Sequence, residues 1–74
     1  MGGNTKHSVL IAGHRTSVSL EPEFWREFAS ICHEEGIAIS KKVEEIDSQR
    51  TENLSSAIRL FVLGELRERL ARTD

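Results

Sequence analysis

Polar and apolar residues alternate strictly between Arg15 and Leu20. This alternation predicts an extended strand with one face that can be buried and one polar face. The first face carries Thr16, Val18 and Leu20, and the second carries Arg15, Ser17 and Ser19. The preceding segment 9–12 is also β-prone, but Gly13 leaves little room for a clean hairpin. We therefore expect one strand over about residues 9–20, bent at Gly13.

A single strand leaves its backbone donors and acceptors unpaired. No other segment of the chain has a convincing strand pattern, so the sequence predicts that a second copy supplies the partner. Two identical strands that pair antiparallel about a two-fold axis form a ribbon that fits a DNA major groove. The expected fold is mainly α with one short β-strand, in an intertwined homodimer with an intermolecular ribbon.

The spacing of apolar residues after the strand predicts three helices, over about residues 22–35, 40–48 and 54–71. Pro22 suits the first position of a helix, and Gly36 suits its end. The middle of the third helix is apolar nearly all round, which is typical of a segment at a dimer centre. The residues that we expect in the dimer core are Val18, Leu20, Phe28, Ile58, Phe61 and Val62.

The length and composition of the chain agree with association. A chain of 74 residues is one domain, close to the size at which a single core is marginal. Cys32 is the only cysteine, so no disulfide can compensate, and we expect it in the core. Residues 1–7 are polar and glycine-rich, which predicts a flexible arm before a domain over residues 8–74. Without a secretion signal or a long apolar run, the expected location is the cytoplasm.

The net charge of −2 hides an uneven distribution of charged residues. Lys6 and Arg15 precede Leu20 with no acid among them, whereas all 12 acidic residues lie from Glu21 onward. A cationic strand with an acidic helical body is compatible with DNA binding through one face. The histidines and Cys32 lack the spacing of a metal site, so we expect no metal and no cofactor. A chain this small and helical is also not expected to be an enzyme.

The segment over about residues 15–46 resembles the ribbon-helix-helix family of bacterial DNA-binding proteins, of the Arc, MetJ and CopG type. The resemblance rests on an alternating strand that ends in Leu20, the Glu-Pro-Glu helix start at 21–23, and an ordered set of later positions. Those positions are Phe24, Trp25, Phe28, Ile31, Cys32, Gly36, Ile37 and Ser40. The Gly-His-Arg-Thr-Ser and Asn-Leu-Ser-Ser-Ala segments are similar to a small bacterial subgroup with an added C-terminal helix.

The resemblance implies that Arg15, Ser17 and Ser19 contact bases. It also implies that backbone N–H groups at the start of the second helix hold a phosphate. The residues expected at phosphates are Lys6, Ser40, Lys41 and Lys42. Ala38 stands at the usual capping position, so the cap is expected to shift to Ser40 or to be lost. The third helix is an alternative source of both the phosphate clamp and the dimer core.

The sequence therefore predicts a homodimer that binds double-stranded DNA sequence-specifically, as a transcriptional repressor or autoregulator, with possible higher-order assembly on DNA. One alternative is an antitoxin or adaptor that uses the C-terminal helix to bind another protein. Another is a plasmid or chromosome partition protein, which would use the same DNA chemistry. A neighbouring toxin gene or a co-purifying protein would distinguish the adaptor from the regulator.

Overall fold

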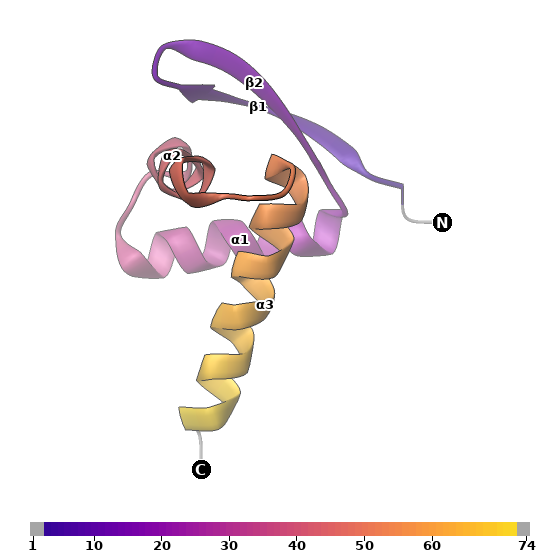
Figure 1. The fold of residues 1–74 in the computed structure, drawn as a ribbon. Coiled ribbons are helices and arrows are strands. Elements are labelled where there is room, and N and C mark those ends of the chain that lie inside the picture. The colour runs from indigo at the N-terminus through magenta and orange to yellow at the C-terminus, as the bar shows by residue number, and fades with distance from the viewer. Residues whose placement is uncertain (1–2, 73–74) are drawn as a thin grey trace.

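A computed structural model describes residues 3–72 as a two-stranded antiparallel sheet followed by three helices (Figure 1). The elements are β1 (Thr5–Ile11), β2 (His14–Leu20), α1 (Pro22–Glu35), α2 (Ile39–Gln49) and α3 (Leu54–Arg72). The three helices begin and end within one residue of the bounds expected from the apolar spacing. None of the helices in this part of the chain is long and apolar enough to cross a membrane.

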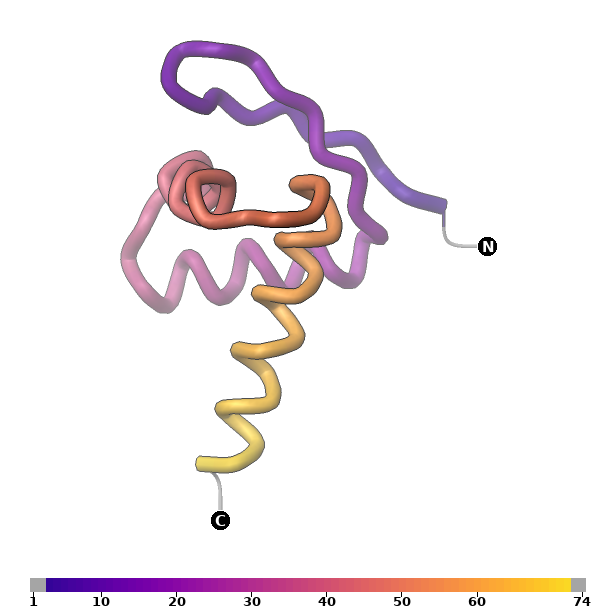
Figure 2. The backbone as a smooth tube through the Cα atoms, viewed as in Figure 1, coloured from indigo at the N-terminus to yellow at the C-terminus, as the bar shows by residue number. Residues whose placement is uncertain are grey.

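The expectation of one continuous strand over residues 9–20 is wrong. The chain reverses at Ala12 and Gly13, and β1 pairs antiparallel with β2 from Ile11–His14 to Thr5–Leu20 (Figure 2). Both turn residues have positive φ, 51° and 83°, as a type I′ turn requires. A two-residue turn of this type matches the twist of the strands, so Gly13 leaves enough room for a hairpin. The strand therefore finds its partner within its own chain and needs no second copy.

The expectation of a flexible arm over residues 1–7 is also wrong from Thr5 onward, where β1 begins. Thr5, Lys6 and His7 belong to β1 and pair with the last three residues of β2. The ring of His7 stacks on Trp25 of α1, with 3.7 Å between ring centroids and 4° between ring planes. Residues 1–2 lie outside the described part of the chain, so the expected arm is tested only from residue 3 onward.

One face of the hairpin packs on the helices and closes a core within the single chain. α2 contacts β1, and α3 contacts β2, α1 and α2. The core consists of the buried residues Val9, Val18, Leu20, Phe28, Ile31, Cys32, Val43, Leu54, Ile58 and Val62. Five of the six residues expected in a dimer core are fully buried here, and only Phe61 is partly exposed. In this conformation those five side chains have no surface left to offer a second chain.

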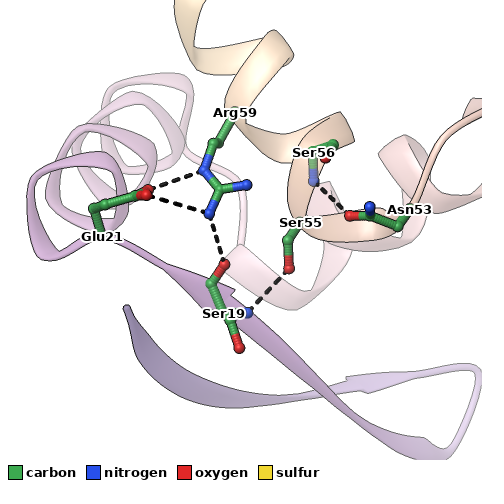
Figure 3. Close-up of polar contacts among 6 residues, drawn as sticks. All are labelled: Ser19, Glu21, Asn53, Ser55, Ser56 and Arg59. Atoms are coloured by element: carbon green, nitrogen blue, oxygen red, sulfur yellow. Dashed lines mark hydrogen bonds and ion pairs between the residues drawn. The ribbon is translucent and has the colours of Figure 1, made fainter. Parts of the chain in front are cut away.

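A network of polar contacts fixes the end of β2 to α3 (Figure 3). Because the pair that closes a two-residue turn is hydrogen-bonded, the N–H and C=O of Ser19 point away from β1. The N–H donates to Ser55 Oγ at 3.0 Å, and the C=O accepts from Arg59 Nη2 at 3.4 Å. Arg59 Nε also donates to Glu21 Oε1 at 2.9 Å. We call Ser19, Glu21, Ser55 and Arg59 the strand clasp.

The strand clasp changes the acidity of Glu21. The hydrogen bond from Arg59 is the main cause that holds the pKa of the Glu21 carboxyl below its ordinary value of 4.5. A lowered pKa means that the folded chain favours the ionised carboxylate. The clasp is therefore complete at neutral pH and weakens as acid protonates Glu21.

The turn geometry gives a first testable prediction. Ala12→Asn should raise the free energy of unfolding by about 0.5–1 kcal/mol, because Asn tolerates positive φ better than Ala in a type I′ turn. Gly13→Ala should lower the free energy of unfolding by a similar amount, because a residue with a β-carbon is disfavoured at the positive φ of this position. Urea denaturation of both variants measures the two changes. A loss of stability in Ala12→Asn would contradict the turn.

The strand clasp gives a second prediction, on the pH dependence of stability. Replacing Glu21 by Gln removes a group whose stabilisation is full above its unfolded pKa and is lost as pH falls through its lower folded pKa. The stability difference between the wild type and Glu21→Gln should thus be largest above about pH 4.5 and shrink below it. Urea denaturation at a series of pH values tests this. A difference that stays constant on acidification would show that Glu21 is not coupled to Arg59. Glu23→Gln, at an exposed acid with no ion pair among the described residues, is the control.

Candidate nucleic-acid interface

The face of the hairpin that points away from the helices is mostly polar and open to solvent. Alternation along the two strands places on this face Lys6, Ser8 and Leu10 from β1 and Arg15, Ser17 and Ser19 from β2. They form the cross-strand pairs Lys6–Ser19, Ser8–Ser17 and Leu10–Arg15. All six are exposed except Ser19, which is half-buried. We call these six residues the outward face.

The three residues predicted to contact bases lie together on the outward face. Arg15 and Ser17 are exposed, while the backbone of Ser19 is held by the strand clasp. The alternation of β2 was enough to place these three side chains. The sequence does not place Ser8 and Leu10 on this face, because it predicts one bent strand instead of two paired strands. Their signal is the β-prone run over residues 9–11, which is followed by the Ala-Gly pair of the turn.

The chemistry of the outward face suits base edges. A guanidinium such as that of Arg15 can donate two hydrogen bonds to guanine O6 and N7, and serine hydroxyls can donate or accept. Leu10, which is 57% exposed, offers an apolar surface of the kind that contacts a thymine methyl group. No acidic residue lies on this face, and its two charges, Lys6 and Arg15, are positive. A two-stranded ribbon is also narrow enough for the major groove of B-DNA.

The first turn of α2 lies beside β1. Ile39 and Ser40 line a shallow groove together with Ser8, Leu10 and Trp25. The N-cap of α2 is Ala38, whose side chain cannot cap, so the expected cap has been lost and has not shifted to Ser40. The backbone N–H groups of this turn lack a side-chain acceptor, and a helix N-terminus with free N–H groups favours an anion.

The start of α3 is already engaged within the chain. Asn53 Oδ1 accepts from the N–H of Ser56 at 2.9 Å, which caps the helix, and the Ser55 hydroxyl takes part in the strand clasp. Of the two helix starts that the sequence left open as a phosphate clamp, α2 is therefore the more accessible.

The three lysines expected at phosphates differ in availability. Lys6 and Lys41 are exposed, whereas the Lys42 side chain is largely buried. Lys42 Nζ lies 3.0 Å from Glu35 Oε1 and 3.3 Å from Glu45 Oε1, and 5.2 Å from the ring centroid of Phe61. The hydrogen bond to Glu35 is the main cause that raises the pKa of the Lys42 ammonium. Lys42 thus ties α2 to α1 and α3, and its charge is already neutralised.

The remaining candidates for chemistry are structural in this part of the chain. Burial raises the pKa of the Cys32 thiol, which keeps it protonated inside the core. No group of three or more histidine, cysteine or acidic side chains among the described residues could hold a metal ion. His7 Nε2 is buried without a hydrogen-bond partner, while the ring itself packs on Trp25.

Comparison with known proteins agrees with this geometry. A family model described as a ribbon-helix-helix domain matches residues 4–66, which include both strands, α1, α2 and the first two-thirds of α3. Neither the search of curated proteins nor the search of solved structures found a match. The family model covers most of the chain. The chain therefore belongs to the ribbon-helix-helix family, a family of non-enzymatic DNA-binding proteins.

Proposed function

We propose that this chain is a sequence-specific DNA-binding regulator that inserts the outward face of its own hairpin into the major groove. The observation that carries the proposal is the row of three cross-strand pairs, Lys6–Ser19, Ser8–Ser17 and Leu10–Arg15. These side chains are presented together on one side of a two-stranded ribbon. The opposite side is fixed to the helices, so the ribbon is presented in a constant orientation.

Base recognition in this proposal centres on Arg15. Arg15 belongs to the cross-strand pair next to the one that closes the turn, and the turn end of the hairpin lies over α2 (Figure 1). Its guanidinium can donate two hydrogen bonds to a guanine. Ser17 and Ser19 follow along the same strand and read neighbouring polar edges. Ser8 of β1 lies directly opposite Ser17 and adds a second hydroxyl to this part of the outward face.

Phosphate contacts would set the register of the hairpin on the duplex. The uncapped start of α2, at Ile39, Ser40 and Lys41, lies beside β1, next to the outward face. A phosphate on the groove wall could accept hydrogen bonds from these N–H groups, with the exposed Lys41 and Lys6 adding positive charge. We do not assign this role to Lys42, which is held by two glutamates.

We further propose that the chain acts as a homodimeric repressor or autoregulator. One hairpin covers only a short stretch of groove, whereas two copies can read two half-sites about one helical turn apart. Members of the ribbon-helix-helix family typically form dimers. A dimer bound at an operator would block access to a promoter by occupying the groove.

The base-contacting role gives a third prediction. Arg15→Ala should weaken binding to the preferred operator by about 1–3 kcal/mol and relax the preference at one base position. Selection of bound sequences from random DNA identifies the operator, and mobility-shift titrations at fixed salt compare the variants. Arg26→Ala is the matched control, because Arg26 is an exposed arginine on α1, away from the outward face. Equal affinities of the wild type and Arg15→Ala would exclude the role.

The phosphate-contacting role gives a fourth prediction. Lys41→Ala should weaken binding about equally for all DNA sequences and reduce the slope of log affinity against log salt by about 1. Lys42→Ala should leave that slope unchanged and lower the free energy of unfolding instead, because it removes the ion pairs with Glu35 and Glu45. A salt slope that responds to Lys42 and not to Lys41 would reverse the assignment.

A further inference from the structure

Leu10 differs in its chemistry from the rest of the outward face. It is the apolar member of this set of six residues, whose other members are polar or charged. Leu10 is 57% exposed, and within residues 3–72 the other exposed large apolar side chains, Leu60, Leu63 and Leu70, all lie on α3. A lone leucine on a polar face is not the extended apolar patch that binds another protein. Leu10 therefore offers a contact about the size of one small apolar group.

The partner of Leu10 across the hairpin is Arg15. The neighbouring pair, Ile11–His14, closes the two-residue turn and is hydrogen-bonded, so Leu10 and Arg15 form a pair of the non-hydrogen-bonded kind. Side chains approach most closely in pairs of this kind, with about 4.5–5.5 Å between β-carbons. The leucine and the guanidinium are thus presented side by side at one level of the ribbon.

The side chain of Arg15 is not engaged by the fold. Within the described ranges of the chain it takes part in no ion pair, unlike Arg50, Arg59 and Arg69. Its guanidinium is therefore available to the O6 and N7 atoms of a guanine. Successive base pairs are only about 3.4 Å apart along the duplex. When Arg15 occupies the edge of a guanine, a side chain beside it reaches the edge of the neighbouring base pair.

The apolar feature of the major groove is the methyl group on C5 of thymine, because the other recognition groups there are hydrogen-bond donors and acceptors. Cytosine methylated at C5 carries the same group on the same ring carbon. A leucine gains nothing from a polar edge, whereas it can cover a methyl group and remove it from water.

We infer that Leu10 and Arg15 act as one reading unit, in which Arg15 binds a guanine and Leu10 contacts the 5-methyl group of a pyrimidine in the neighbouring base pair. This inference rests on the proposed function, since it names a feature of the DNA that the outward face recognises. It gives β1 a share in base recognition, whereas the sequence placed the base contacts on β2 alone. It also makes binding sensitive to methylation of cytosine at that position.

The test compares DNA duplexes that differ by a single methyl group. Selection from random DNA should return a thymine in a base pair next to the guanine whose preference depends on Arg15. Replacing that thymine by deoxyuridine removes only the methyl group, and it should weaken binding of the wild type about fourfold in mobility-shift titrations at fixed salt. Equal affinities for the thymine and deoxyuridine duplexes would overturn the inference.

Variants at Leu10 show whether this residue senses the methyl group. Leu10→Ala should bind the thymine and deoxyuridine duplexes equally well, while Leu10→Met, which keeps an apolar side chain of similar reach, should retain most of the difference. Leu60→Ala is the matched control, because Leu60 is 56% exposed but lies on α3, and this variant should keep the full fourfold difference. Circular dichroism confirms that the variants are folded. A methyl preference that survives in Leu10→Ala would overturn the inference.

A second pair of duplexes distinguishes the two sources of the methyl group. With cytosine or 5-methylcytosine at the same position, the wild type should bind the methylated duplex about fourfold more tightly, and Leu10→Ala should bind both equally. A methyl effect at thymine without one at cytosine would overturn the proposed sensitivity to methylation and support thymine as the group that is read.

Failure of this inference can be distinguished from failure of the proposed function. If Arg15→Ala loses affinity for the operator but no duplex shows a methyl effect, only the reading role of Leu10 is excluded. If neither Arg15→Ala nor Leu10→Ala changes binding to any of the duplexes, the outward face does not read bases and the proposed function fails as well.

Discussion

The backbone hydrogen-bonding requirement of β2 determines how this molecule is built. An extended segment must pair its N–H and C=O groups, and the turn at Ala12 and Gly13 supplies the partner from the same chain. Once β1 is paired with β2, the alternation of each strand sorts side chains to two faces. Val9, Val18 and Leu20 then close the core, while the outward face receives the polar residues and Leu10.

The strand clasp couples this hairpin to the helical body. Ser19 is paired with Lys6 across the hairpin, but its backbone groups point outward and would be unsatisfied without Ser55 and Arg59. Arg59 in turn neutralises Glu21 at the start of α1. The start of α3, which is 36 to 40 residues away in the sequence, thus holds the end of β2 and the start of α1 together. A rigid supporting contact of this kind is what a base-reading strand needs, because small changes in orientation move its side chains off the base edges.

The surfaces of the molecule differ in their charge. The outward face has only positive charges, and Lys42, at the junction of the three helices, is neutralised by Glu35 and Glu45. The exposed acids Glu23 and Glu27 belong to α1 and add no negative charge to the outward face. A chain with a net charge of −2 can therefore present a locally cationic ribbon.

Local patterns in the sequence determined the three helices, the ends of α1 and the orientation of Arg15, Ser17 and Ser19. Each of these depends on residues a few positions apart, such as Pro22 and Gly36. The partner of β2 was decided by tertiary structure, because Ala12 can adopt positive φ only at a cost that the pairing and packing of β1 offset. The buried positions of Phe28, Ile58 and Val62 followed, since a closed single-chain core needs no second subunit to cover them. The strand clasp and the ion pairs of Lys42 could not be predicted from the sequence for a related reason. They join side chains whose distance depends on how all the elements pack.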